Sequence, residues 1–138
     1  MSETLSFPYV KVSNALGEVT PRPLLPITLM HQNQVQETLG LLDSGADVNV
    51  LPFQIGLQLG LIWEAQRHQF QLSGNLANFE ARGVILSATV GAFPPVRLAF
   101  AWTRASTVSL ILGQVNFFME YDVCFSRSDL KFELRAKS

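Results

Sequence analysis

Cysteine and histidine are both scarce in this chain of 138 residues. The single cysteine, Cys124, cannot form an intramolecular disulfide, so we expect a reducing compartment and a cytoplasmic location. The two histidines, His31 and His68, accompany no recognisable nucleophile, and the chain has no Cys-x-x-Cys or His-Glu-x-x-His motif. A Ser-His-Asp triad therefore has no support, and we expect neither a metal nor a cofactor.

Charge of one sign and long apolar runs are also missing. Ten Lys and Arg side chains balance eleven Asp and Glu, giving a net charge of −1 without any block of like charge. Nucleic-acid binding depends on clustered positive charge, so we expect no nucleic-acid partner. The longest apolar stretch near the C-terminus, 108–119, is interrupted by polar residues and is shorter than the roughly 20 residues that span a bilayer. We therefore expect no membrane span, and the acidic N-terminus is not typical of a signal peptide.

Apolar residues are abundant instead. They make up 48% of the chain, while charged residues contribute only 15%, below the roughly 25% typical of soluble domains. The length fits one domain, 1–138, which leaves about a third of its unfolded surface exposed. Because so apolar a chain has more apolar surface than one small domain can bury, we expect part of that surface to contact another chain.

Short β-branched or alternating runs, separated by turn residues, favour strands over long helices. The expected strands are 7–12, 27–31, 35–42, 48–51, 66–72, 79–90, 96–102, 108–112, 122–126 and 130–134. A proline-rich connector at 21–26 cannot be helical, and short helices are expected at 53–61 and 114–120. The pattern predicts an all-β protein with one or two short helices and barrel-like closure.

One turn carries a chemically interesting carboxylate. Asp43, Ser44 and Gly45 directly follow the apolar strand expected at 35–42. A carboxylate in that place is partly desolvated and within reach of backbone donors. Asp-Ser-Gly is also simply favourable turn chemistry, because Asp and Ser bond their own backbone and Gly permits unusual dihedral angles. The turn alone leaves both interpretations open.

Two motifs in order make the chain resemble the retropepsin-like aspartic proteases, the single-domain relatives of pepsin. The first reads LLDSGAD from Leu41 to Asp47, and the second reads LILG from Leu110 to Gly113. A turn sequence between them, Ser73 to Asn75, stands where that family has its flap. The resemblance implies a closed β-barrel with a β-hairpin flap, active as a two-fold dimer. It also implies an N-terminal extension at 1–22, a flap hairpin region at 66–90 and a C-terminal hairpin at 121–134.

The resemblance further implies peptide-bond hydrolysis by a water held between two aspartates, one from each subunit of a homodimer. The implied site consists of Asp43 as the catalytic residue, Ser44, Gly45, Ala46, Leu112 and Gly113 as its support, and Asp47, Val48, Ser73, Gly74 and Asn75 as substrate-binding residues. A peptide or protein is the implied substrate. Val48, Val50, Leu72, Leu76 and Ile111 are candidates for the apolar pockets.

Two departures from the family pattern favour an alternative. Retroviral relatives often have Arg after the Gly of the second motif, where this chain has Gln114, so Arg104 or Arg127 is expected to replace it beside Asp47. The flap also has one glycine where retroviral flaps have several. A dimeric peptide-binding or scaffolding module with weak or lost catalysis is the second hypothesis. An unrelated β-barrel with an incidental Asp-Ser-Gly turn is the third.

Overall fold

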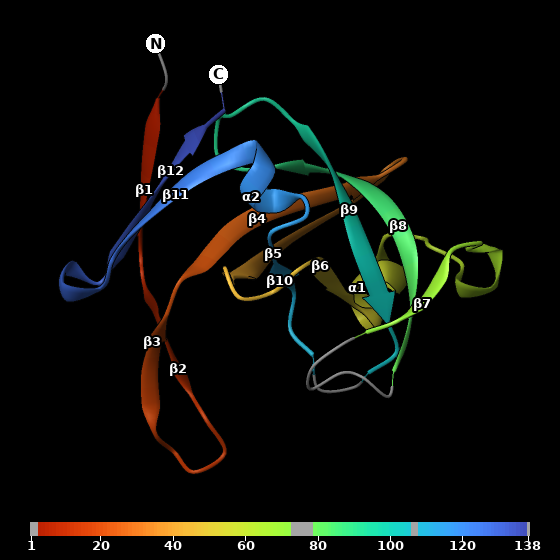
Figure 1. Cartoon of the computed structure of the whole chain (residues 1–138), viewed down its shortest axis with the longest axis horizontal. Coiled ribbons are helices and arrows are strands. Elements are labelled where there is room, and N and C mark those ends of the chain that lie inside the picture. The colour runs from red at the N-terminus through yellow and green to blue at the C-terminus, as the bar shows by residue number, and fades with distance from the viewer. Residues whose placement is uncertain (1–2, 73–78, 106–107, 138) are drawn as a thin grey trace.

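Six strands close into a barrel in the computed structural model, which describes residues 3–72, 79–105 and 108–137 (Figure 1). Their order around the barrel is β4 (Leu24–His31), β5 (Gln34–Leu42), β10 (Ile111–Leu112), β6 (Asn49–Pro52), β9 (Val96–Thr103) and β8 (Glu80–Thr89). The barrel closes because β8 also pairs with β4, Leu29 lying opposite Ala88. The all-β barrel predicted from the sequence is confirmed.

The core fills this barrel and extends under the C-terminal strands. Its largest fully buried side chains include Trp102, Phe117 and Phe132. Trp102 lies in β9 against α1 (Phe53–Gln58), where its indole occupies the space that a Cβ at Gly56 would need. Each such side chain stabilises the fold by about 2–3 kcal/mol through burial of apolar surface. The glycine inside α1 is therefore a packing requirement.

Both expected helices are present but shorter than predicted. α1 ends at Gln58 rather than 61, because Gly60 has a φ of +82° and turns the chain away from the helix. α2 covers only Phe117–Glu120, since the Gln114 and Val115 amides donate to the Ala46 and Asp47 carbonyl oxygens instead of beginning the helix. A 3₁₀ turn, η1 (Trp63–Ala65), precedes the strand expected at 66–72. Residues 66–68 are not in a strand, so β7 covers only Gln69–Gln71.

The terminal segments form two further sheets. β1 (Thr4–Pro8) pairs with β12 (Lys131–Ala136), which pairs with β11 (Tyr121–Ser126); η3 (Arg127–Asp129) joins the last two strands. β2 (Val10–Ser13) and β3 (Val19–Arg22) form a two-stranded ribbon. The single strand expected at 7–12 is thus wrong: it divides at Tyr9, whose amide donates to Leu130 O at 2.8 Å.

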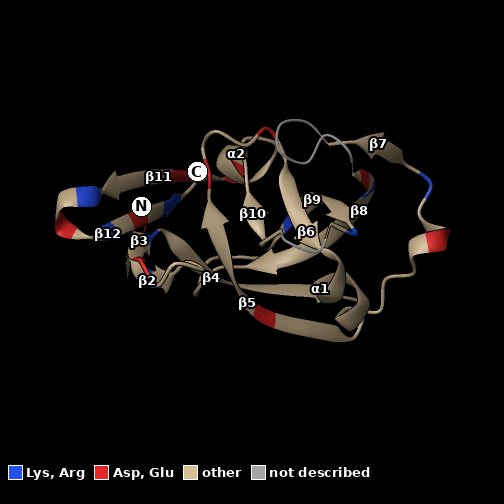
Figure 2. Ribbon diagram, turned by 90° about the horizontal axis from the view of Figure 1, so that it is seen from below, with Lys and Arg blue, Asp and Glu red and all other residues tan. Residues whose placement is uncertain are grey.

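Charged side chains are distributed singly over the molecule. Figure 2 shows the two signs interspersed on the ribbon, with no block of either. Within the described residues, no helix is long and apolar enough to cross a membrane.

Candidate active site

Asp43 lies at the end of β5, on a segment fixed by the second sequence motif. β10 runs parallel to β5, with Leu112 beside Leu42, and the Asp43 amide donates to Leu112 O at 3.0 Å. These bonds join two segments that are far apart in the sequence. The Asp43 side chain is half-buried, because its backbone leaves the barrel at this point. The structure therefore places the two motifs side by side.

The turn after Asp43 orients its carboxylate. The Gly45 amide donates to Asp43 Oδ1 at 3.0 Å, and the Ala46 amide donates to the Asp43 carbonyl oxygen at 3.1 Å. A backbone N–H that bonds a carboxylate oxygen limits the rotation of that carboxylate. Ser44 and Gly45 are exposed at the surface of the turn. Among the described residues, no hydrogen bond to the other carboxylate oxygen, Oδ2, is found.

Gly113 allows the two motifs to approach closely. A Cβ at this position would lie 2.6 Å from Val48 O and 2.8 Å from Ala46 O, both backbone atoms. Only glycine fits such a contact without moving the chain. Leu112 is fully buried beneath the turn. We name residues 43–48 and 112–115 the active-site floor.

Gln114, on the exposed side of the floor, links the two segments of the floor by hydrogen bonds. Its Nε2 donates to Ser44 O at 2.8 Å, and its amide donates to Ala46 O at 2.9 Å. The expected replacement of the family arginine is wrong, since neither candidate arginine pairs with Asp47 in the described part of the chain. Arg104 pairs with Glu64 at 3.6 Å, and Arg127 lies over the Tyr9 ring. Asp47 is instead exposed, and its carbonyl accepts the Val115 amide at 2.8 Å.

Two asparagines, the buried Asn49 and the half-buried Asn116, hold neighbouring segments beside the floor, and the sequence reasoning missed them. Asn49 is fully buried; its Oδ1 accepts the Gly113 amide at 2.7 Å, and its Nδ2 donates to Ala99 O at 2.9 Å. Asn116 accepts the Ala99 amide at 3.0 Å and donates to Arg97 O at 3.0 Å. Buried amide groups need hydrogen-bond partners. The one Asn within the apolar run 48–51 was therefore the feature of the sequence that could have predicted this contact.

The proposed flap is described only at its base. Ser73, Gly74, Asn75 and Leu76 lie outside the described residues. β7 and β8 pair antiparallel, Phe70 opposite Ala81, so a hairpin leads toward the expected tip. Leu72 packs with Ala81 and Ala101 in a small cluster that also contacts Val48 of the floor. Of the other pocket candidates, Val50 is buried and Ile111 is half-buried.

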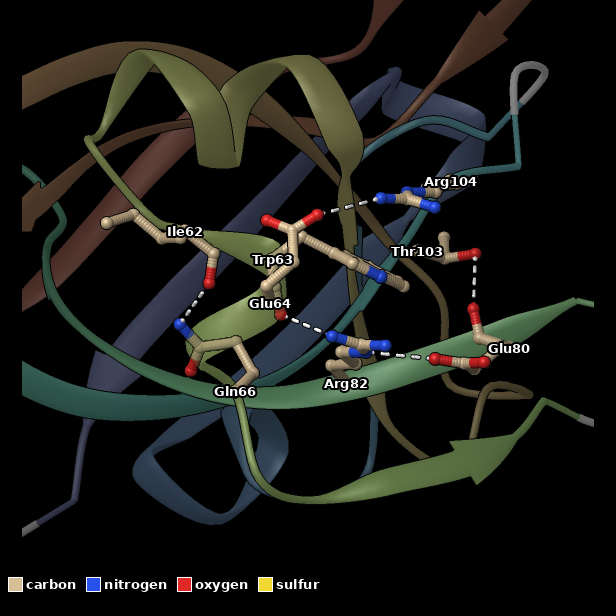
Figure 3. Close-up of polar contacts among 8 residues, drawn as sticks. All are labelled: Ile62, Trp63, Glu64, Gln66, Glu80, Arg82, Thr103 and Arg104. Atoms are coloured by element: carbon tan, nitrogen blue, oxygen red, sulfur yellow. Dashed lines mark hydrogen bonds and ion pairs between the residues drawn. The ribbon is translucent and has the colours of Figure 1, made fainter.

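The base of the hairpin is held by stacked cations, shown in Figure 3. Arg82 lies over the Trp63 ring at 4.5 Å, donates to Trp63 O, and pairs with Glu80 at 2.9 Å. Arg104 lies over the same ring at 4.6 Å. Each cation–π contact contributes about 0.5–1 kcal/mol at a partly exposed site. The start of β8 is therefore anchored to the η1 turn.

This arrangement supplies one oriented carboxylate and no metal site among the described residues, where no group of three His, Cys, Asp or Glu side chains converges. The floor therefore carries two carboxylates: the half-buried Asp43, which accepts a backbone amide, and the exposed Asp47.

The closed barrel, the Asp-Ser-Gly turn on its floor and the hairpin above it define a retropepsin-like fold. A retropepsin-like aspartic protease from Rickettsia conorii has a solved structure that matches with a TM-score of 0.63 over 99% of this chain and 94% of that one. The two are 13% identical in sequence, so the likeness is one of fold. No family model and no curated protein matches the chain. The third hypothesis, an unrelated barrel, is wrong.

Proposed function

We propose that the chain is half of a homodimeric aspartic endopeptidase in which Asp43 of each subunit supplies one catalytic carboxylate. The observation that carries the proposal is the Asp43 carboxylate, held by the Gly45 amide on the Gly113-supported floor of a retropepsin-like barrel. The fold makes the class plausible, and the oriented, half-buried carboxylate supplies the chemistry.

The proposed mechanism needs two carboxylates in near contact. Two such groups about 3 Å apart cannot both ionise, so they share one proton and titrate as a pair. The ionised Asp43 takes a proton from a water that attacks the peptide carbonyl carbon. The protonated Asp43 of the other subunit donates to the carbonyl oxygen. Collapse of the tetrahedral intermediate breaks the C–N bond after the nitrogen is protonated, and no covalent enzyme intermediate forms.

Two features support a two-fold dimer with the axis beside Asp43. A closed isologous interface brings identical residues near its axis face to face. Val115 and Met119 are more than half exposed next to the floor, so apolar surface is available there. β11 is an edge strand of the terminal sheet, and unpaired strand edges readily pair with another chain. An interface at these places would bury part of the excess apolar surface that the composition predicts.

The proposed substrate is an extended peptide lying between the hairpin and the floor. Extended peptides bind through main-chain hydrogen bonds and alternate side-chain pockets. Val48 and Leu72, which share a cluster, would contribute apolar walls to such pockets, with Asp47 beside the peptide backbone. Cys124, exposed on β11, is compatible with the reducing compartment that we propose, the cytoplasm.

A dimeric peptide-binding module without catalysis is the second candidate. Gln114 favours it, because this side chain bonds Ser44 O and leaves Asp47 without the arginine partner common in retroviral relatives. The module would bind peptides without turnover. The same assay therefore separates the two candidates.

Asp43→Asn is the decisive variant. We expect the wild-type protein to cleave a diverse peptide library at mildly acidic pH, and the variant to lose at least about a thousandfold of that activity. Its solution mass should stay that of a dimer, since Asn preserves the shape of the side chain. Asp129→Asn, in the distant η3 turn, is the matched control and should keep full activity. Undiminished cleavage by Asp43→Asn would contradict the proposal, and binding without cleavage by wild type would favour the module.

A further inference from the structure

The β2–β3 ribbon, which we name the arm (Val10–Arg22), stands apart from the rest of the molecule. Within the described residues its two strands pair only with each other, Val12 opposite Thr20 and Ser13 opposite Val19. Residues 11–20 are all exposed. Figure 1 shows the arm pointing away from the barrel. Both of its faces are thus available to another surface.

The tip of the arm is a hydrogen-bonded turn with a leucine at its apex. Asn14 Oδ1 accepts the Leu16 amide at 2.9 Å and the Glu18 amide at 3.0 Å. Gly17 has a φ of +79°, in the left-handed region that favours glycine. These bonds hold Leu16 at the apex, where 84% of its surface is exposed. An apolar side chain held in this manner is suited to act as an anchor in a contact.

The arm lacks what an independent hairpin needs. Cross-strand neighbours share a face, so Val12 projects from one face and Val19 from the other. An isolated two-stranded hairpin is at best marginally stable in water, and a third strand or a packing surface is needed to hold it. Its β-branched residues are stiff and favour the extended form. Among the described residues, no packing surface covers the arm, whose residues 11–20 are all exposed.

The arm starts beside Asp43. Pro23 O, one residue beyond the arm, accepts the Leu42 amide at 3.1 Å, and Leu24 pairs with Leu41. From Arg22 to Leu16 the ribbon covers six residues, about 20 Å at roughly 3.3 Å per residue. In a dimer whose axis passes beside Asp43, an arm of that length rooted there is long enough to reach the other subunit.

We propose that the arm packs against the second copy of this chain across the two-fold axis. The inference rests on the proposed function, because the second copy is the one that completes the Asp43 pair. A stable interface buries about 800 Å² of each partner. Three exposed apolar side chains on a ribbon open on both faces would add to the apolar surface available at Val115 and Met119.

The test removes the apolar contacts without touching the barrel. The triple variant Val12→Ser, Leu16→Ser, Val19→Ser keeps the ribbon's turn residues. The matched control is Val35→Ser, Ile62→Ser, Ile85→Ser, whose exposed fractions of 51–62% compare with 41–84% in the arm. Ile62 and Ile85 line a pocket beside the β4–β5 turn, where Val35 also lies. Sedimentation velocity over a range of concentrations measures the dimer dissociation constant of each protein.

We expect the arm variant to raise the dimer dissociation constant at least about tenfold, as loss of a buried anchor does. The control should change it less than about twofold. Peptide cleavage by the arm variant should fall at low protein concentration and recover at high concentration. A wild-type dimer with an unchanged dissociation constant in the arm variant overturns the inference and leaves the proposed function standing. A raised KM with an unchanged dissociation constant also overturns it, assigning the arm to substrate. A wild-type monomer at every concentration overturns both.

Discussion

The active-site floor and the arm are held in opposite ways. The floor is fixed by bonds between segments far apart in sequence: Asp43 to Leu112, Ser44 to Gln114, and Gly113 to Asn49. The arm's bonds, within the described residues, run between its own strands and within its tip. The floor's geometry is therefore a property of one folded barrel. The arm's geometry depends on the surface that it meets.

Gly113→Ala should break the floor most severely. The added Cβ meets the Val48 and Ala46 carbonyl oxygens at 2.6 and 2.8 Å, so the two motifs must separate. We expect a loss of about 3 kcal/mol in the free energy of unfolding, the upper range for overpacking, and loss of peptide cleavage. Urea unfolding at a fixed protein concentration measures the change, since dimer stability depends on concentration.

Gly17→Ala is the matched glycine in the arm. Its Cβ would meet no atom within 4 Å, and the cost is the left-handed φ of +79° alone. That strain of about 1–2 kcal/mol falls on a ribbon that opens separately, so the unfolding of the barrel should change little. Equal destabilisation by the two substitutions would contradict the distinction between floor and arm.

Asn49→Ala should weaken the floor by a smaller amount. The substitution leaves the buried Gly113 amide and the Ala99 carbonyl without their partner. Unsatisfied buried groups cost about 1–3 kcal/mol, so we expect about 2 kcal/mol in unfolding free energy together with a reduced kcat. Asn14→Ala, which removes the side chain that organises the arm's tip, is the control. It should leave the barrel's unfolding midpoint and kcat unchanged, and a kcat loss as large as that of Asn49→Ala would refute the difference.

The floor was partly predictable from the sequence. The short alternating runs predicted the all-β barrel, and the resemblance carried by the two motifs implied that Leu112 and Gly113 pack beneath the Asp43 turn, where the structure places them. Asn49 was not predicted, because its partner Gly113 lies far along the chain and one polar residue in an apolar run does not name its partner. The bond from Gln114 to Ser44 was hidden for the same reason.

The arm was not predictable, because its signals are contradictory at the local level. Pro21 suggested a connector, but it lies in β3 opposite Lys11, and a proline fits there because an edge strand can omit one N–H donor. The run from Phe7 to Val12 has the pattern of one strand. It divides because Tyr9 bonds Leu130 in the terminal sheet, a contact that depends on the tertiary fold. Strand assignment therefore failed where two sheets meet.

Tyr121→Phe should have the smallest effect, confined to alkaline pH. Tyr121 follows α2, is almost fully buried, and its hydroxyl has no hydrogen-bond partner in the described structure. Burial, with a smaller effect of Glu120, raises the pKa of Tyr121 above its ordinary value of 10.0. The unfolded chain then releases the phenol proton first, so wild-type stability declines as pH rises from about 10 through the raised pKa. The variant should lack this decline and stay within about 1 kcal/mol of wild type below pH 9.

Tyr9→Phe, at the only other tyrosine, is the control. It should retain the wild-type profile in urea unfolding measured from pH 8 to 11. If the free energy of unfolding of Tyr121→Phe still declines over this pH range, a group other than Tyr121 causes the loss of stability.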